Sequence, residues 1–533
     1  MRDADSEVTA MIERPLLQVP MTLSRIPALA ASRFGNKQAL TSADGNLSFA
    51  ELDELSARLA QGLVHAGIRS GDRVTLCGPN SWRWVVTYYA VARAGAVVNP
   101  VNAMLTQNEL EYIVSNCGAR ALISTAEKIS DWTGKPGLSP SVLAVLDGTG
   151  CAAAPSIDSL LAPAVNLTTD AEVAPEDLST ICYTSGTTGH PKGAMLSHRA
   201  VVTNSAMTAQ MHGRNQQDIT LTALPFSHVY GNVVMNASVL TGGTLAVQSR
   251  FEVEPFLHTL ERERATVIDG VPTMYMYLLA HPALSTTDTS SLRCAFVGGQ
   301  SMPEAKMAEV EERFGCPLVE LWGMTEIAGL GSTHPHLGER VHGSIGIALP
   351  YSALRVARLE NVEEDTADAE IGELMVRGAT VMSGYYGNPE ATSETIESDG
   401  WLHTGDLARR DEAGRFYVVD RKKDMILTAG YNVYPAELER VIAAHPAVAM
   451  VAVGRLPDEM KGEIAKAYIV LKPAVEATDV EIIAHCREHL AAYKVPRLVQ
   501  FVSDLPKTST GKILRRELHT LEARSVRAAQ RVG

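Results

Sequence analysis

The feature that most constrains this chain is the stretch from Tyr183 to Gly193, which reads Tyr-Thr-Ser-Gly-Thr-Thr-Gly-His-Pro-Lys-Gly. Glycines let a backbone turn sharply and approach a ligand closely. Hydroxyls can donate to phosphate oxygens, and a lysine adds a positive charge. The stretch supplies all three groups through Thr184, Ser185, Gly186, Thr187, Thr188, Gly189 and Lys192. It therefore predicts a phosphate-binding loop whose natural ligand is ATP.

This loop is not a Walker P-loop. The pattern Gly-x-x-x-x-Gly-Lys-Ser/Thr fits neither this stretch nor Gly511-Lys512, which is followed by Ile513 in place of a hydroxyl. A P-loop kinase is therefore disfavoured. By composition alone such a loop is as often a surface turn as a ligand site, and the lysine and proline in fixed order favour a ligand site.

Length and charge narrow the class of protein. A chain of 533 residues exceeds what one hydrophobic core usually supports, so two or more domains are expected. A net charge of -14 argues against broad nucleic-acid binding. The seven cysteines are scattered and form no Cys-x-x-Cys pair, which is typical of buried thiols in a reducing compartment. We expect no membrane span, because no stretch stays apolar for about 18 residues, and we expect a cytoplasmic location.

The order of apolar patterns predicts an α/β fold. Short apolar strands alternate with helical periods over residues 23–124, as in a parallel sheet covered by helices. Short strands and glycine turns over residues 372–407 predict a β-rich subdomain. We thus expect a large N-terminal domain of layered α/β subdomains plus this β-rich subdomain over 1–420, a charged hinge at 421–424, and a small mobile C-terminal α+β domain over 425–533.

A glutamate and a histidine lie at turns where ligands could bind. Two apolar strands, 292–299 and 318–322, end in small residues, and ligands of open α/β sheets bind at such carboxyl edges. Glu326 follows the second strand, although such a glutamate is usually only a charge at a helix start. Pro225 and Gly231 bracket a turn that displays His228, and a lone histidine is more often structural than catalytic.

Together these blocks resemble the adenylate-forming superfamily, which includes acyl-CoA synthetases, luciferases and peptide-synthetase adenylation domains. The blocks occur in the family's order from the phosphate loop to Arg516, and include Gly323-Met324-Thr325-Glu326, Gly405-Asp406 and Gly511-Lys512. Each block alone is a modest signal. Their common order makes coincidence implausible.

The resemblance implies roles for individual residues. Trp322 would stack on the adenine of the nucleotide. The residues that line the base would be Gly299, Gln300 and Ser301, with Gly323 and Met324 after the tryptophan. Asp406 and Arg421 would hold the ribose hydroxyls. Thr325 would contact the α-phosphate, and Thr184 and Glu326 would coordinate Mg²⁺. Lys512 would bridge the carboxylate and the α-phosphate, Lys423 would occupy the hinge, and Gly430 would line a pantetheine tunnel. His228 would deprotonate the acyl carboxyl group or gate its pocket.

The implied chemistry is ATP-dependent activation of a carboxylic acid. The carboxylate attacks the α-phosphorus of ATP and expels pyrophosphate, and the thiol of CoA then attacks the acyl carbon and releases AMP. Charge gathers at phosphorus in the first step, which explains Mg²⁺ and a lysine at that point. The expected cofactors are ATP, Mg²⁺ and CoA. A lysine that is needed for one half-reaction would obstruct the other. The hinge is therefore expected to move this lysine between the two steps.

Two departures from relatives bear on the acid. Domains that bind amino acids carry an aspartate in the block matching Leu224–Gly231, and this block has no acidic residue, so an amino acid is disfavoured. Acetate-specific relatives carry a tryptophan at the position of Gly323, so glycine is expected to leave room for a longer acid and Gly323→Trp to shift preference toward acetate. The expected acyl pocket would take a fatty, aryl or arylalkanoic acid. Its walls are Val229, Tyr230, Val233, Val297 and Gly298, with Val234 and Met274.

Two alternatives stay open. The chain could load an acyl group onto the phosphopantetheine of a carrier protein instead of onto CoA. It could also be a silent nucleotide sensor, although a sensor has no need of Lys512, Glu326 and Asp406 together. The expected partners are a small carboxylic acid, ATP and CoA, without nucleic acid, and homodimers are frequent in such families.

Overall fold

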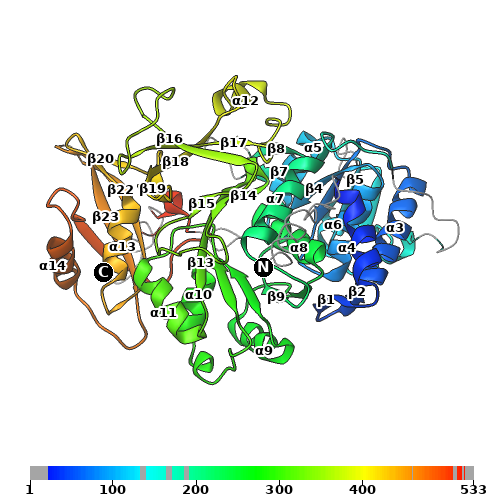
Figure 1. Ribbon diagram of the computed structural model, residues 1–533, viewed down its shortest axis with the longest axis horizontal. Coiled ribbons are helices and arrows are strands. Elements are labelled where there is room, and N and C mark those ends of the chain that lie inside the picture. The colour runs from blue at the N-terminus through cyan, green and yellow to red at the C-terminus, as the bar shows by residue number, and fades with distance from the viewer. Residues whose placement is uncertain are drawn as a thin grey trace, which may run out of the picture.

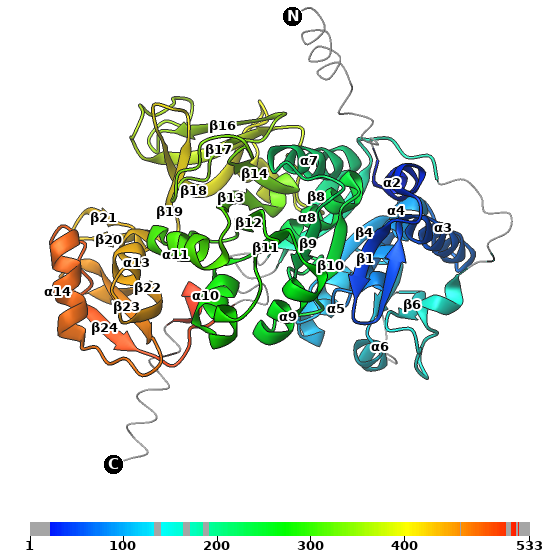
Figure 2. The same ribbon diagram turned by 60° about the horizontal axis from the view of Figure 1, so that its bottom comes forward.

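The computed structural model describes residues 22–132, 140–161, 163, 171–184, 191–458, 460–507, 513–518 and 521. Four sheets organise these residues. The C-terminal sheet lies at one end of the molecule and strands β1 and β2 at the other, in both views of the chain (Figures 1 and 2). No helix among the described residues has both the length and the apolar character needed to cross a bilayer.

The first sheet has six strands, all parallel except for the antiparallel pair β7–β8. In sheet order the strands are β6 (Val142–Val145), β5 (Ala121–Ser124), β3 (Arg73–Cys77), β4 (Val97–Val101), β7 (Leu178–Thr184) and β8 (Lys192–Ser197). The helices of this part of the chain are α3 (Phe49–His65), α4 (Trp82–Arg93), α5 (Gln107–Asn116) and α6 (Ala126–Trp132). The phosphate loop connects β7 to β8.

The second sheet has nine strands with a parallel centre. Its order is β15 (Ile347–Ala348), β14 (Gly329–Thr333), β13 (Leu318–Met324), β12 (Cys294–Val297), β11 (Val267–Gly270), β9 (Ile219–Thr222), β10 (Thr244–Val247), β1 (Gln38–Ser42) and β2 (Gly45–Ser48). The accompanying helices are α2 (Ile26–Phe34), α7 (His198–Met211), α8 (Val229–Thr241), α9 (Val253–Glu263), α10 (Pro272–Ala280) and α11 (Glu304–Phe314).

Two helices join the sheets. Helix α4 connects β3 to β4 in the first sheet, and α8 connects β9 to β10 in the second. The buried hydroxyl of Tyr88 on α4 donates to Asn232 at 3.1 Å, and that of Tyr89 donates to Asn236 at 2.9 Å. Both partners are on α8. The two sheets therefore share one continuous core, as expected of layered α/β subdomains.

The last two sheets carry the rest of the chain. The β-rich subdomain is a four-stranded antiparallel sheet of β16 (Ser352–Ala357), β17 (Gly372–Gly378), β18 (Leu402–Arg410) and β19 (Phe416–Arg421), with helix α12 (Pro389–Thr395). The C-terminal sheet contains β20 (Ile426–Thr428), β21 (Tyr431–Val433), β22 (Val448–Asp458), β23 (Gly462–Leu471) and β24 (Leu498–Phe501), with helices α13 (Pro435–Ala443) and α14 (Asp479–His489). The expected α/β class is confirmed by this arrangement.

The C-terminal sheet has a hydrophobic core of its own, which includes Ile426, Leu438 and Ile469 and is separate from the main core. Such separation suits a small domain that turns as a unit. Strand β19 runs through Arg421, so the first residue of the predicted hinge belongs to a strand. The predicted domain limits at 420 and 424 stay predictions.

A buried ion pair fixes the second sheet. Asp269 on β11 is fully buried, and Arg214 donates to both of its carboxylate oxygens from 2.7 Å. Burial raises the pKa of Asp269, and the Arg214 guanidinium opposes that shift. Removal of one partner from a buried pair leaves the other charge without compensation.

We therefore expect Asp269→Ala to lower the free energy of unfolding by about 3–5 kcal/mol, because Arg214 would keep a buried charge. The control is Glu54→Ala, which removes the exposed i,i+4 pair with Arg58 at 3.3 Å and should cost about 0.5 kcal/mol or less. Denaturant unfolding of both variants measures the difference. Equal effects of the two substitutions would contradict the assigned role of Asp269.

Candidate active site

A cavity of about 1450 Å³ lies between the large domain and the C-terminal domain. Its floor is formed where β12 and β13 end, at the carboxyl edge of parallel strands. Residues of β18 and β19, of α13 and of 513–515 complete the lining. Both domains therefore contribute to one site.

Most of the predicted site residues line this cavity. They are Thr184, Lys192, His228, Gly299, Gln300, Ser301, Trp322, Gly323, Met324, Thr325, Glu326, Asp406, Arg421 and Lys423. The predicted loop residues Ser185, Gly186, Thr187, Thr188 and Gly189, and Lys512, lie outside the described residues. Gly430 is in the turn between β20 and β21 and is not part of the lining.

The predicted acyl-pocket residues lie elsewhere. Val229, Tyr230 and Val233 on α8, and Val297 at the end of β12, are buried in the main core and are not part of the cavity lining. At Gly298 an added Cβ would lie 2.2 Å from Leu321, so there is no open space there either. The lining near α8 and α10 consists instead of Ser227, His228, Pro272, Thr273 and Met276.

An aromatic ring, a carboxylate and a guanidinium are joined by direct contacts in the site. The Nε1 group of Trp322 donates to Asp406 at 2.7 Å, and Arg421 lies 2.6 Å from the other carboxylate oxygen. Strand pairing explains this geometry, because Asp406 and Arg421 are direct partners in β18 and β19. A Cβ at Gly331 would lie 2.3 Å from the indole, so glycine lets Trp322 lie against β14. The hydrogen bond to Asp406 therefore fixes one edge of the indole, and the ring also packs against β14.

A second set of polar contacts lies around Glu326. This glutamate is 8% exposed and accepts a hydrogen bond from the hydroxyl of Tyr385 at 2.8 Å. Burial, together with the charge of Glu326, raises the pKa of Tyr385, so the phenol keeps its proton and donates. The ammonium of Lys192 lies 5.2 Å from the centre of the same ring. The sequence analysis assigned no role to Tyr385, because a tyrosine in a glycine turn carries no signal of its own.

The oxygen groups at this point suit Mg²⁺. The carboxylate of Glu326 and the hydroxyl of Thr184 both line the cavity, and hard oxygen ligands are those that Mg²⁺ prefers. Among the described residues, no cluster of three acidic or histidine side chains gathers here. This is the pattern of an ion held by one or two protein groups together with substrate phosphates.

His228 begins helix α8 as its N-cap. Its Nδ1 accepts a hydrogen bond from the backbone N–H of Tyr230 at 3.3 Å. In the neutral ring the proton is therefore on Nε2, which makes that nitrogen a donor. His228 lines the cavity beside Ser227, so the histidine has a helix-capping role and is also open to a ligand.

Glu320 was missed by the sequence analysis. It lies on β13, lines the cavity and is 4% exposed. Its Oε2 atom has no hydrogen-bond partner among the described residues. Burial raises the pKa of Glu320 to about 8. A lone glutamate inside an apolar strand, Leu-Val-Glu-Leu-Trp, was the available signal.

The described residues on both sides of 508–512 make contacts within the C-terminal domain and with α10. Lys507 donates to the hydroxyl of Tyr277 on α10 at 2.6 Å, lies 5.1 Å from the centre of that ring, and also pairs with Asp504. Lys507 forms a β-bridge with Ile513, and Ile513 lines the cavity. Arg515 is held by Glu439 through its Nε at 3.2 Å. The residues that directly follow 508–512 therefore lie at the site.

The structure places Gly323 against a neighbouring strand. A Cβ at this position would lie 2.0 Å from the carbonyl oxygen of Gly329 on β14. Glycine is needed here because the two strands approach closely at a β-bulge between Trp322 and Gly323. The expected shift of Gly323→Trp toward acetate stays a prediction, and this variant would also have to displace the backbone of β14.

Comparisons with known families match most of this chain. The model of the AMP-binding enzyme family matches residues 28–386, and that of the AMP-binding enzyme C-terminal domain matches residues 437–512. A feruloyl-CoA synthase from Amycolatopsis is 38% identical over 89% of this chain and 93% of its own length. A long-chain-fatty-acid–CoA ligase from Bacillus subtilis is 33% identical, with 93% and 94% covered.

Solved structures agree with these matches. ATP-bound MatB from Rhodopseudomonas palustris is 32% identical and superimposes with a TM-score of 0.85 over 93% of this chain and 98% of that one. The anthranilate CoA ligase AuaEII in complex with anthranoyl-AMP is 27% identical, with a TM-score of 0.87 over 94% and 97%.

The carboxyl of Glu320 should make stability depend on pH. Its pKa is raised in the folded state, so its contribution is complete below the unfolded pKa, near 4.3, and is lost as pH rises through about 8. Glu320→Gln does not titrate. The melting temperature of the variant minus that of the wild type, measured without nucleotide, should therefore increase as the pH rises from 5.5 to 8.5. A constant difference would show that Glu320 is not buried in this way.

Gly323→Ala should destabilise the fold, because the new methyl group must displace the backbone of β14, and overpacking of this kind costs about 1–3 kcal/mol. The matched control is Gly454→Ala on β22, where the nearest atom would be a side-chain carbon of Leu518 at 3.3 Å. Thermal unfolding of both variants measures this. A neutral Gly323→Ala would mean that the strands do not approach so closely.

Proposed function

The chain belongs to the AMP-binding enzyme family, and from that premise we propose that it is an AMP-forming carboxylic acid:CoA ligase. The proposal rests on one observation above all. The cavity between the domains gathers the indole of Trp322, the buried carboxylates of Asp406 and Glu326, the ammonium of Lys192 and, from the C-terminal domain, residues 513–515. These groups match the parts of ATP and of an acid.

The nucleoside end of ATP fits the groups around Trp322. The indole is fixed at its edge by Asp406 and can stack on a base. The Oε2 atom of the Glu320 carboxyl has no partner among the described residues, and a carboxyl group at this point suits the polar edge of adenine. Asp406 keeps acceptor capacity beyond its bonds to Trp322 and Arg421, and this capacity suits the hydroxyls of ribose.

The phosphate end fits the groups around Glu326. Lys192 lines the cavity and would contact the β- and γ-phosphates together with the predicted loop hydroxyls, and Thr325, next to Glu326, would contact the α-phosphate. Glu326 and Thr184 would hold Mg²⁺, which supplies neutralisation of charge on the phosphates when it is bound. Tyr385 donates to Glu326 and fixes the orientation of that carboxylate. We assign Tyr385 as a positioning residue.

The first half-reaction joins the acid to the α-phosphate. An oxygen of the carboxylate attacks the α-phosphorus, the bond to the β-phosphate oxygen breaks, and pyrophosphate leaves. Lys512 would lie between the two anions and reduce their repulsion. The Nε2–H group of His228 can donate to the acyl carboxylate and orient it, because Nδ1 is engaged with Tyr230.

The second half-reaction transfers the acyl group. The thiol of CoA attacks the acyl carbon, the mixed anhydride opens, and AMP leaves with the oxygen that attacked phosphorus. The thiol of CoA has to approach the acyl carbon. While Lys507 is bound to Tyr277, Lys512 would obstruct that approach. Rotation about residues near Lys423 would remove this obstruction, and the separate core of the C-terminal domain suits such a motion.

The acid is proposed to be apolar and longer than acetate. Relatives at 33–38% identity are named for feruloyl, long-chain fatty and bicyclic propanoyl substrates. The acyl side of the cavity is reached past Pro272 and Met276, which are apolar. A fatty, aryl or arylalkanoic acid fits these groups.

The proposal is tested by incubating the protein with ATP, Mg²⁺, CoA and a panel of C2 to C16, aromatic and hydroxy acids. Mass spectrometry should detect one or more acyl-CoA products, with an equal amount of AMP. Acyl-AMP that accumulates without thioester would instead support transfer to a carrier protein. An absence of AMP with every acid would favour the silent sensor.

The contact between Lys507 and Tyr277 should serve adenylation alone. Lys507→Met removes the hydrogen bond and the cation–π contact, so we expect pyrophosphate–ATP exchange to fall about tenfold, equivalent to about 1.4 kcal/mol. Thioester formation from added acyl-AMP should change little, because that step uses the other orientation. Tyr277→Phe keeps the ring and should give a smaller loss.

Arg487→Met provides the control, since it removes an exposed cation of the C-terminal domain far from this contact. It should leave both half-reactions unchanged. Equal losses of both half-reactions in Lys507→Met would contradict a role confined to one orientation. Lys512→Ala is the reference for complete loss of exchange.

A further inference from the structure

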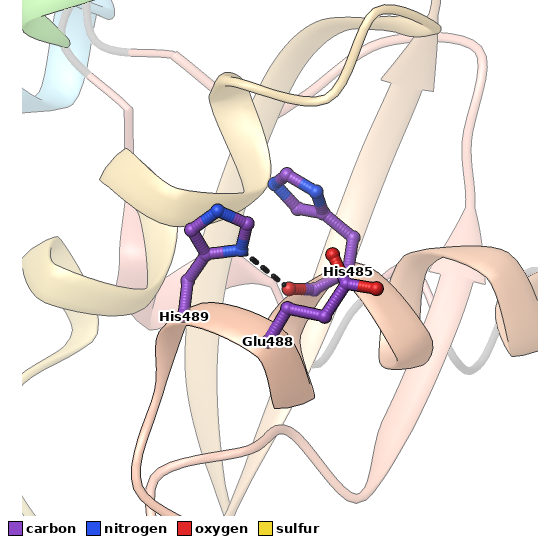
Figure 3. Close-up of side chains that lie close together, drawn as sticks. All are labelled: His485, Glu488 and His489. Atoms are coloured by element: carbon purple, nitrogen blue, oxygen red, sulfur yellow. Dashed lines mark hydrogen bonds between the residues drawn. The ribbon is translucent and has the colours of Figure 1, made fainter.

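A cluster of metal-ligating side chains lies on helix α14, outside the proposed active site. The helix ends with His-Cys-Arg-Glu-His, in which His485, Glu488 and His489 are three and four residues apart. Residues with this spacing lie on one face of a helix. One donor atom from each side chain lies within 4.8 Å of the others. Figure 3 shows the two rings and the carboxylate on the same side of α14.

Backbone carbonyls fix the protons of both histidines. Nε2 of His485 lies 3.0 Å from the carbonyl oxygen of Val441 on α13, and Nδ1 of His489 lies 2.9 Å from that of His485. A carbonyl only accepts, so these nitrogens carry the protons. The opposite nitrogens, Nδ1 of His485 and Nε2 of His489, hold lone pairs. A hydrogen bond from the second ring nitrogen to a carbonyl is the usual support of a metal-bound histidine.

The surroundings favour a cation over a merely solvated face. The rings of His485 and His489 are 4.6 Å apart between centres, so both imidazoles lie close enough to reach one ion. Glu488 is exposed and, among the described residues, forms no ion pair that would compete for its carboxylate. His445 packs at 5.3 Å from His485 as a third ring beside the cluster.

We propose that His485, Glu488 and His489 bind a divalent transition-metal ion of the Zn²⁺ or Ni²⁺ class. Two imidazole nitrogens and a carboxylate suit these ions, and water would complete the coordination. Mg²⁺ and Ca²⁺ prefer oxygen ligands and do not fit. Cys486 lies between the ligands in sequence but is buried, and burial raises its pKa to about 11, so no thiolate joins the set.

The site should act on the C-terminal domain and not on catalysis. Helix α14 lies at the end of the molecule away from β1 and β2, and none of the three ligands lines the cavity (Figure 1). His485 contacts α13 through Val441, so a bound ion would brace the end of α14 against α13. An ion that binds only the folded helix raises the unfolding temperature by mass action.

The test uses the full-length protein, stripped with chelator and titrated with Zn²⁺ at pH 7.5 in a calorimeter. We expect one equivalent to bind, and a millimolar excess of Mg²⁺ not to compete. His489→Ala should weaken the binding at least tenfold, and Glu488→Gln should weaken it less. His65→Ala, which removes an exposed histidine of α3, is the matched control and should bind as the wild type does.

Co²⁺ provides a readout that does not depend on stability, because its absorption spectrum reports nitrogen and oxygen ligands directly. A spectrum that appears in the wild type and is lost in His489→Ala would support the site, and circular dichroism would verify that the variant is folded. Two results would overturn the proposal. One is no saturable binding by the wild type, and the other is equal affinity in His489→Ala and His65→Ala.

Discussion

One buried carboxylate connects the parts of this molecule that have to meet. Asp406 accepts from Trp322, which belongs to the nine-stranded sheet, and pairs with Arg421, its neighbour in the β-rich subdomain. Arg421 is also the last residue of β19 and the first residue of the predicted hinge. The proposed base-stacking ring, the proposed ribose acceptor and the start of the hinge are therefore held by one set of bonds. A displacement of any one of them would disturb the other two.

The rest of the site follows from two constraints on charge. An acid and a triphosphate repel each other, so positive groups must surround the point where they meet. Those groups come from different elements: Lys192 from the strand after the phosphate loop, and the segment of Lys512 from the C-terminal domain. Since the second positive group also blocks the thiol, it is better supplied by a part that can withdraw. A small domain with its own core, held at the rim by Lys507 and Tyr277, meets that need.

Local patterns predicted much of this from the sequence. The phosphate loop, the glycine turns and the strand ends are short-range features, and residues such as Glu326, Asp406 and Trp322 were found because each belongs to such a block. Tyr385, Tyr277 and Glu320 were not found, because their roles depend on the fold. Tyr385 contacts Glu326, which is 59 residues away in the sequence, and Tyr277 contacts Lys507, which is 230 residues away. Oε2 of Glu320 has no hydrogen-bond partner among the described residues. A sequence also does not show that the backbone of β14 lies against Gly323.

The most direct test follows one oxygen atom. The protein is given a carboxylic acid labelled with ¹⁸O in its carboxylate, together with ATP, Mg²⁺ and CoA, and the AMP is analysed by mass spectrometry. If the carboxylate attacks the α-phosphorus, each AMP carries one labelled oxygen, and the pyrophosphate carries none. AMP without label, or label in inorganic phosphate, would contradict the acyl-adenylate and with it the account of this cavity.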